Sequence, residues 1–105
     1  MSATVQQPQS VTVIMQDDTR KHIDNPYILT SYSSKVAVYD RENEHIYLLP
    51  KYAYSNTTTK HVHAFIADYT RQPFTSYADM RKDAKGAQRN YTFIEHIKSE
   101  NGWLL

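Results

Sequence analysis

Apolar and polar residues alternate most clearly between positions 35 and 49. Residues 35–39 alternate in hydrophobicity, residues 40–44 form a polar run, and residues 45–49 are again rich in strand-forming side chains. This pattern predicts an antiparallel β-hairpin with a loop of about four residues. The runs 11–15 and 27–32 also have the composition of strands.

Side chains two positions apart in a strand share a face of the sheet. Val36 and Val38 are therefore expected on one face of the hairpin, and Ile46 and Leu48 likewise share one. If Tyr39 and Tyr47, the tyrosines of the two hairpin strands, point away from these four apolar residues, the second face of the sheet is aromatic. Such a face can stack single-stranded bases, pack under helices or meet a protein partner, and we favour burial under helices.

Residues 57–69 have the spacing of an amphipathic helix. Positions i, i+3, i+4 and i+7 of this segment are apolar and would form one stripe: Val62, Phe65, Ile66 and Tyr69. Further along, Ser76 with Asp79 and Thr92 with Glu95 match the capping-box pattern of a helix start. The last third of the chain is therefore predicted to be helical.

Together these elements predict an α+β fold. A small antiparallel sheet of about three strands, including the hairpin 35–49, would be packed by a helix at 57–69, with one or two further C-terminal helices. Residues 1–10 are polar and predict a flexible tail, and residues 11–105 are expected to form a single domain.

Composition narrows the possible functions. The chain has no cysteine, which excludes disulfides, thiolate-bound zinc and a cysteine nucleophile. Two glycines in 105 residues leave no nucleophile elbow or phosphate-binding loop, so we expect neither enzyme activity nor a cofactor. Without a signal-peptide pattern or an apolar run of membrane-spanning length, the protein is expected in the cytoplasm.

Charge is unevenly distributed along the chain. Residues 1–50 contain four Lys/Arg against six Asp/Glu, whereas residues 51–105 contain eight against five. Basic side chains neutralise phosphates, so the basic half is a candidate nucleic-acid surface formed by Lys60, His61, Arg71, Arg81, Lys82, Lys85 and Arg89. The alternative is an ordinary solvated helix face, because Asp79 and Asp83 lie among these cations.

The start of the predicted helix is a second candidate site. Backbone N–H groups there, with the side chains of Asn56, Thr57, Thr58 and Thr59, could bind an anion, although simple helix capping is the commoner role of such residues. His61 and His63 would point about 200° apart on a helix, so they cannot share a metal ion, and no metal site is predicted.

The motifs Ser31-Tyr32…Val36-Ala37 and Ser55-Asn56-Thr57-Thr58-Thr59-Lys60-His61-Val62…Phe65 resemble a family of small uncharacterised phage and plasmid proteins of Firmicutes, a domain of unknown function. The similarity covers roughly residues 27–69. It implies a mobile-element origin and a place in the bacterial cytoplasm, and it supplies no catalytic residues.

We therefore expect an accessory binding protein whose favoured target is DNA or RNA, contacted through the basic C-terminal half. The alternative is a protein–protein interaction module, such as an inhibitor of a host enzyme or defence system, for which nine tyrosines are suitable contact residues. A homodimer held together by Trp103-Leu104-Leu105 is compatible with either function.

Overall fold

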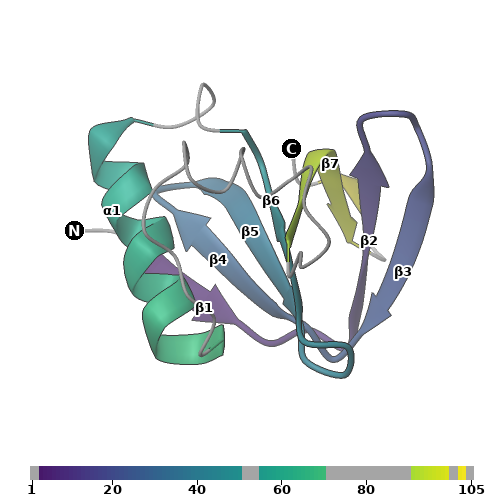
Figure 1. The fold of residues 1–105 in the computed structure, drawn as a ribbon, viewed down its shortest axis with the longest axis horizontal. Helices are drawn as coiled ribbons and strands as arrows, with labels where there is room; N and C mark the ends of the chain where they lie inside the picture. Colours follow the sequence, from purple (N-terminus) through teal and green to yellow (C-terminus); the bar gives the residue numbers. More distant parts are fainter. Residues whose placement is uncertain (1–2, 51–54, 71–90, 100–101, 104–105) are drawn as a thin grey trace.

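The computed structural model describes residues 3–50, 55–70, 91–99 and 102–103. Most of these residues lie in strands, and one helix follows the sixth strand (Figure 1). In chain order the elements are β1 (Ala3–Gln6), β2 (Ser10–Met15), β3 (Arg20–Asp24), β4 (Tyr27–Ser31), β5 (Ser34–Asp40), β6 (His45–Leu48), α1 (Asn56–Phe65), a π-helical turn (Ile66–Thr70), β7 (Tyr91–Ser99) and β8 (Gly102–Trp103).

The strands form one sheet in the order β1-β4-β5-β6-β7-β2-β3, with β8 paired to β7. Neighbouring strands are antiparallel except β6 and β7, which are parallel. The sheet curls into a half-barrel, with α1 beside β1 and β4 at one end and the β2–β3 hairpin at the other (Figure 1). The segment between the parallel strands contains α1.

The predicted fold class was wrong. We expected about three strands and several helices. The described residues instead form a mostly β structure, in which one large, curled sheet is accompanied by a single short α-helix. Residues 3–6, expected in a flexible tail, form the edge strand β1 against β4. The strands of the hairpin 35–49 and the helix near 57–69 are present locally. The helix expected after Ser76 lies outside the described residues.

Strand β7 occupies the segment that we expected to be the last helix. Its ladder with β2 pairs His96 with Ile14 but Ile94 with Met15, so Glu95 is an extra residue without its own partner, a β-bulge. The bulge resets the alternation, which lets Ile94 and Ile97 both point into the core although they are three positions apart. That spacing is also helical, which explains the wrong prediction.

The hairpin register separates Tyr39 and Tyr47, which would have to share one face for the second face of the sheet to be aromatic. Tyr39 pairs with Ile46, and Val38 pairs with Tyr47. Because directly paired residues share a face, Tyr39 lies on the face covered by α1, and Tyr47 lies on the opposite, concave face. An aromatic second face of the sheet is therefore absent from this hairpin, since one tyrosine goes to each side.

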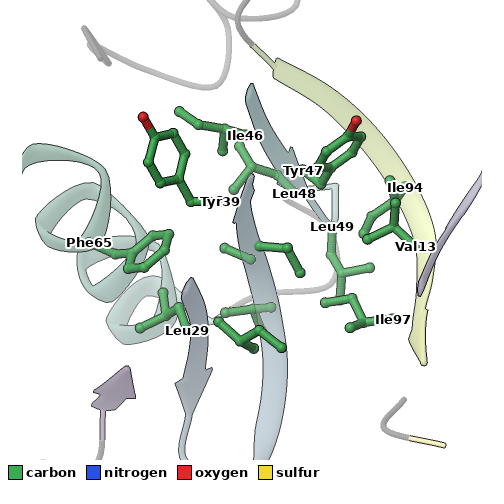
Figure 2. Close-up of a cluster of buried hydrophobic side chains, with 14 of the residues drawn as sticks. Val13, Leu29, Tyr39, Ile46, Tyr47, Leu48, Leu49, Phe65, Ile94 and Ile97 are labelled. Carbon is green, nitrogen blue, oxygen red and sulfur yellow. The ribbon is translucent and has the colours of Figure 1, made fainter. Parts of the chain in front are cut away.

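The hydrophobic core has a part on each side of β4 and β5. Figure 2 shows Leu29, Tyr39 and Phe65 on the helix side and Val13, Tyr47, Leu49, Ile94 and Ile97 on the other. On the concave side, side chains from β2 and β7 meet those of β5 and β6, so the curl of the sheet covers its own apolar face. The apolar area that is buried against α1 fixes the helix on the sheet.

Tyr47 is buried on the concave face of the sheet. Burial raises the pKa of the Tyr47 phenol above its ordinary value, while the nearby Lys21 ammonium, which also hydrogen-bonds it, opposes the shift. The neutral phenol is thus favoured in the folded state. The stability that the neutral Tyr47 phenol contributes is fully present below the unfolded-state pKa of about 10. It is lost as the pH rises through the folded-state pKa.

We therefore expect the free energy of unfolding to fall more steeply between pH 9 and pH 11, estimated from the ordinary tyrosine pKa, in the wild type than in Tyr47→Phe. Denaturant titrations of both proteins at several pH values measure the difference. The comparison removes the contribution of the other tyrosines, which both proteins share. Parallel curves would contradict the raised pKa.

Candidate binding groove

A groove lies between the edge strand β1 and helix α1. Its cavity has a volume of about 360 Å³, at the lower end of the roughly 300–1,000 Å³ typical of ligand pockets. The sheet contributes Ala3, Val5 and Leu29. The register places these three on the same face, since Val5 pairs directly with Leu29 and Ala3 lies two residues before Val5.

The helix contributes one continuous stripe to the groove: His61, Ala64, Phe65, Asp68 and Tyr69. These positions follow the helical i, i+3, i+4, i+7 and i+8 pattern, and the stripe is about 12 Å long at 1.5 Å per residue. Small side chains at Ala3 and Ala64 leave the space open between the two walls. The groove is therefore lined mainly by apolar groups, with Asp68 as the acidic group in its lining.

Two exposed aromatic side chains lie on the helix side of the sheet. Tyr32 and Tyr69, with 56% and 43% of their surfaces exposed, are the large exposed hydrophobic residues of the described chain. The Tyr32 ring lies 5.9 Å from that of His61, at one end of the helical stripe. Tyr69 lines the other end. Exposed tyrosines beside an apolar groove are typical of protein-binding surfaces.

Tyr32 has an unfavourable backbone conformation. Its φ of 58° lies in the left-handed region, as do those of Asp18, Asn25 and Glu44. Asp and Asn tolerate this region, whereas a bulky residue pays about 1–2 kcal/mol. Because Ser31 pairs with Ser34, the β4–β5 turn is only two residues long and holds Tyr32 in place. Strain of this kind in an exposed aromatic residue points to a functional role.

At the other end, Tyr69 is held by an aromatic cluster. Its ring stacks on Phe65 at 5.6 Å and meets Tyr27 edge-on at 5.3 Å, while the Arg41 guanidinium lies 4.5 Å from the Tyr27 ring. The π-helical turn places Tyr69 there, and the hydroxyl of Thr70 donates to the carbonyl of Ile66 at 2.7 Å within that turn. Short π segments often occur at functional sites.

A chain of buried and partly buried hydrogen bonds supports the His61 end of the groove. Ser55 Oγ donates to Thr58 Oγ1 at 3.2 Å, and Ser31 Oγ lies 2.8 Å from both Thr58 Oγ1 and His61 Nδ1. If each hydroxyl accepts once and donates once, the direction runs from Ser55 through Thr58 and Ser31 to His61. His61 Nδ1 is then an acceptor, so the neutral ring has its proton on Nε2. We call this set the hydroxyl relay.

The relay fixes the start of α1. Ser55 is the N-cap, and its Oγ accepts the backbone N–H of Thr58 at 3.1 Å. Thr58 is buried towards Ser31, whereas Asn56 and Thr57 are exposed. Helix capping was the alternative to the predicted anion site at 56–59, and Ser55 has the capping role in the structure. The anion site stays a prediction.

Two of the residues predicted to contact nucleic acid, Lys60 and His61, lie in the described part of the chain. Lys60 is exposed on α1 and His61 is buried in the relay, so their side chains point to different surroundings. Arg71, Arg81, Lys82, Lys85 and Arg89 lie outside the described residues. The described residues contain six Lys/Arg against eight Asp/Glu, a net charge of −2. The described residues as a whole therefore carry no excess of positive charge.

A second cavity, of about 410 Å³, lies beside the β2–β3 turn and is lined by Met15, Asp17, Thr19 and Phe93, among others. The Asp17 carboxylate accepts the backbone N–H of Thr19 at 3.0 Å, and hydrogen bonds from Thr19 lower the pKa of this carboxyl. The Asp17 carboxylate therefore stabilises the β2–β3 turn. Among the described residues, no exposed large aromatic side chain borders this cavity.

Two classes of site can be examined directly in the described residues. No group of three or more His, Asp or Glu side chains there is arranged to hold a metal ion. His61 and His63 both lie on α1, where one is buried and the other partly exposed. No helix in the same part of the chain is long and apolar enough to cross a membrane.

Sequence reasoning singled out His61, Phe65 and Tyr69 of the groove lining but did not predict the groove itself. Ser31, Tyr32, Ser55, Thr58 and His61 were among the residues that suggested a family resemblance, and the structure brings all five together. Ala3, Ala64 and Asp68 carried no sequence signal, because small and single charged residues are common on any surface. Ala3 lies beside α1 only because β1 pairs with β4.

Comparison with known proteins gives a family and no activity. No curated protein and no solved structure matches the chain. A model of a family of unknown function, DUF8033, matches residues 3–83, which is more than half of the chain and includes every residue lining the groove. The expectation of an uncharacterised domain is thereby confirmed, over a longer stretch than residues 27–69. The chain belongs to the DUF8033 family of unknown function.

Proposed function

We propose that this protein is a protein–protein interaction module and that the groove between β1 and α1 is its binding surface. The observation that carries the proposal is the placement of exposed Tyr32 and Tyr69 at the two ends of an apolar groove. Tyrosine combines a large apolar contact area with a polar hydroxyl, which makes it a frequent hot-spot residue. The strain at Tyr32 is explained by the same role.

Filling the groove is expected to abolish partner binding. Ala64 is exposed in the groove, and Ala67, also exposed, lies outside its lining. We expect Ala64→Trp to reduce capture of a bacterial partner protein at least tenfold, about 1.4 kcal/mol, because the indole occupies the partner's space. Quantitative affinity capture from nuclease-treated lysate measures the effect.

Ala67→Trp is the matched control, since it adds the same indole to the same helical segment and should retain the partner. A second variant, Tyr32→Gly, removes the ring and relieves the backbone strain. It should weaken capture while leaving the free energy of unfolding within about 1 kcal/mol. Equal capture by the wild type and Ala64→Trp would refute the proposal.

The partner we expect follows from the resemblance to small phage and plasmid proteins. A protein of a mobile element in the bacterial cytoplasm meets host enzymes and defence proteins, and inhibition by tight binding needs no catalytic residue. The groove fits such a role, because it offers contact area and one acidic side chain, Asp68, in an apolar lining.

Nucleic-acid binding is the second candidate function, and the excess of Lys/Arg in residues 51–105 favours it. Labelled single- and double-stranded DNA and RNA, titrated with the protein at increasing salt, provide the test by fluorescence anisotropy. Phosphate contacts would weaken binding steeply with salt, and the double variant Arg81→Glu/Lys82→Glu should then lose affinity. No binding at low salt would eliminate this candidate.

A further inference from the structure

We infer that the groove binds an extended peptide segment of its partner, which joins the sheet as an additional strand beside β1 and places a basic side chain next to Asp68. This inference rests on the proposed function and specifies its ligand. Three features carry it: the position of β1 in the sheet, the facing of its side chains and the charge in the groove.

Strand β1 is an edge strand. It pairs with β4 on one side, and no described strand pairs with its other side. An edge strand presents backbone N–H and C=O groups that a further strand can pair with. In β-strand addition, these main-chain hydrogen bonds supply affinity, and pockets that receive alternate side chains supply specificity.

The groove provides such a pocket directly beside the open edge. Ala3 and Val5, alternate residues of β1, face α1 across it, while Thr4 between them faces the other side of the sheet. A peptide strand added to β1 would alternate in the same way, so every second side chain would enter the space under Ala64. The 12 Å length estimated for the helical stripe corresponds to about four extended residues at 3.3 Å each, as in β1 itself.

Charge selects among such peptides. Asp68 is an exposed carboxylate in the groove lining, one helical turn beyond Ala64. A lysine or arginine on the peptide would pair with it, whereas an acidic residue would be repelled. The exposed rings of Tyr32 and Tyr69 then cover the peptide at the two ends of the groove. The ligand is therefore an extended segment with alternating apolar residues and a basic residue.

A random heptapeptide library displayed on phage and selected on the immobilised full-length chain tests this inference. Enriched peptides, synthesised with a fluorescent label, should contain apolar residues two apart and a lysine or arginine. Anisotropy should show at least tenfold weaker binding to Ala64→Trp and Asp68→Lys, with Ala67→Trp within twofold of the wild type. A glutamate in place of the peptide's basic residue should restore binding to Asp68→Lys.

Strand addition is tested separately from groove binding by methylating peptide amide nitrogens. One set of alternate amides should lose binding at least tenfold when methylated and the other set should not, and β1 amides should exchange hydrogen more slowly in the complex. Equal tolerance of both sets, helical ligands, or peptides insensitive to Ala64→Trp would overturn the inference. A dimer of the full chain that Ala64→Trp dissociates would overturn it too, because the occupant would be a second copy.

These failures are distinguishable from failure of the proposed function. If a lysate partner still depends on Ala64, the interaction module stands and only its extended-peptide ligand is wrong. If neither the partner nor the peptides depend on Ala64, both are wrong.

Discussion

Ile94→Ala and Ile97→Ala are each expected to destabilise the protein by about 2–5 kcal/mol, a large part of the 5–15 kcal/mol that a domain typically has. Glu95 is the bulged residue of β7, and Ile94 and Ile97 on either side of it are both completely buried. Without the bulge, strict alternation would turn one of them out of the core, and only one of the two substitutions would then be costly. Each substitution loses the burial of the removed carbon atoms and leaves a cavity in the core.

The substitution Glu95→Ala is the control for both isoleucine variants. The Glu95 side chain is exposed, so its removal alone should change the free energy of unfolding by less than about 0.5 kcal/mol. Denaturant unfolding of the wild type and the three variants measures these effects. If either isoleucine variant is as mild as Glu95→Ala, β7 does not use a bulge to bring Ile94 and Ile97 to one face.

Ser31→Ala is expected to destabilise the protein by about 2–3 kcal/mol. Ser31 is 2% exposed and is the central member of the hydroxyl relay, 2.8 Å from both Thr58 Oγ1 and His61 Nδ1. Its loss removes a hydrogen bond from each of these buried partners, and a buried polar group deprived of its partner costs about 1–3 kcal/mol. Because the relay joins β4 to α1, the loosened helix should also weaken binding in the groove.

Ser33→Ala is the matched control, since Ser33 is exposed two residues further along and should be nearly silent. Nitrogen-15 NMR of the histidines provides a direct readout of the relay. In the wild type, neutral His61 should have its proton on Nε2, and Ser31→Ala should alter the Nδ1 resonance. A proton on Nδ1 would show that the relay runs in the opposite direction. A cost of Ser31→Ala no larger than that of Ser33→Ala would contradict the structural role.

The relay and the groove are parts of one arrangement. His61 takes part in both, with Nδ1 in the relay and the ring at the groove beside Tyr32. A satisfied polar network rigidifies the elements that it joins. The relay therefore holds one wall of the groove in place before a ligand arrives, which lowers the entropic cost of binding.

The sequence by itself determined the local elements whose patterns have one interpretation. The alternation in residues 35–49 predicted the strands of the β5–β6 hairpin, and the apolar stripe Val62, Phe65, Ile66 and Tyr69 predicted the helix α1. Both follow from short-range geometry, because side-chain direction repeats every two residues in a strand and every 3.6 residues in a helix. The runs 11–15 and 27–32 were likewise expected to be strands, and residues 11–15 and 27–31 lie in β2 and β4.

Only the tertiary structure decided the rest of the fold. Residues 91–99 contain two isoleucines at a spacing that suits either a helix or a bulged strand, and pairing with β2, some 80 residues earlier, selected the strand. Likewise, residues 3–6 form the strand β1 because they pair with β4, although the segment 1–10 is polar. Local sequence cannot report hydrogen bonds and burial supplied by distant segments, which is why tertiary context overrides local propensity. The groove exists only because such a long-range pairing brings β1 beside α1.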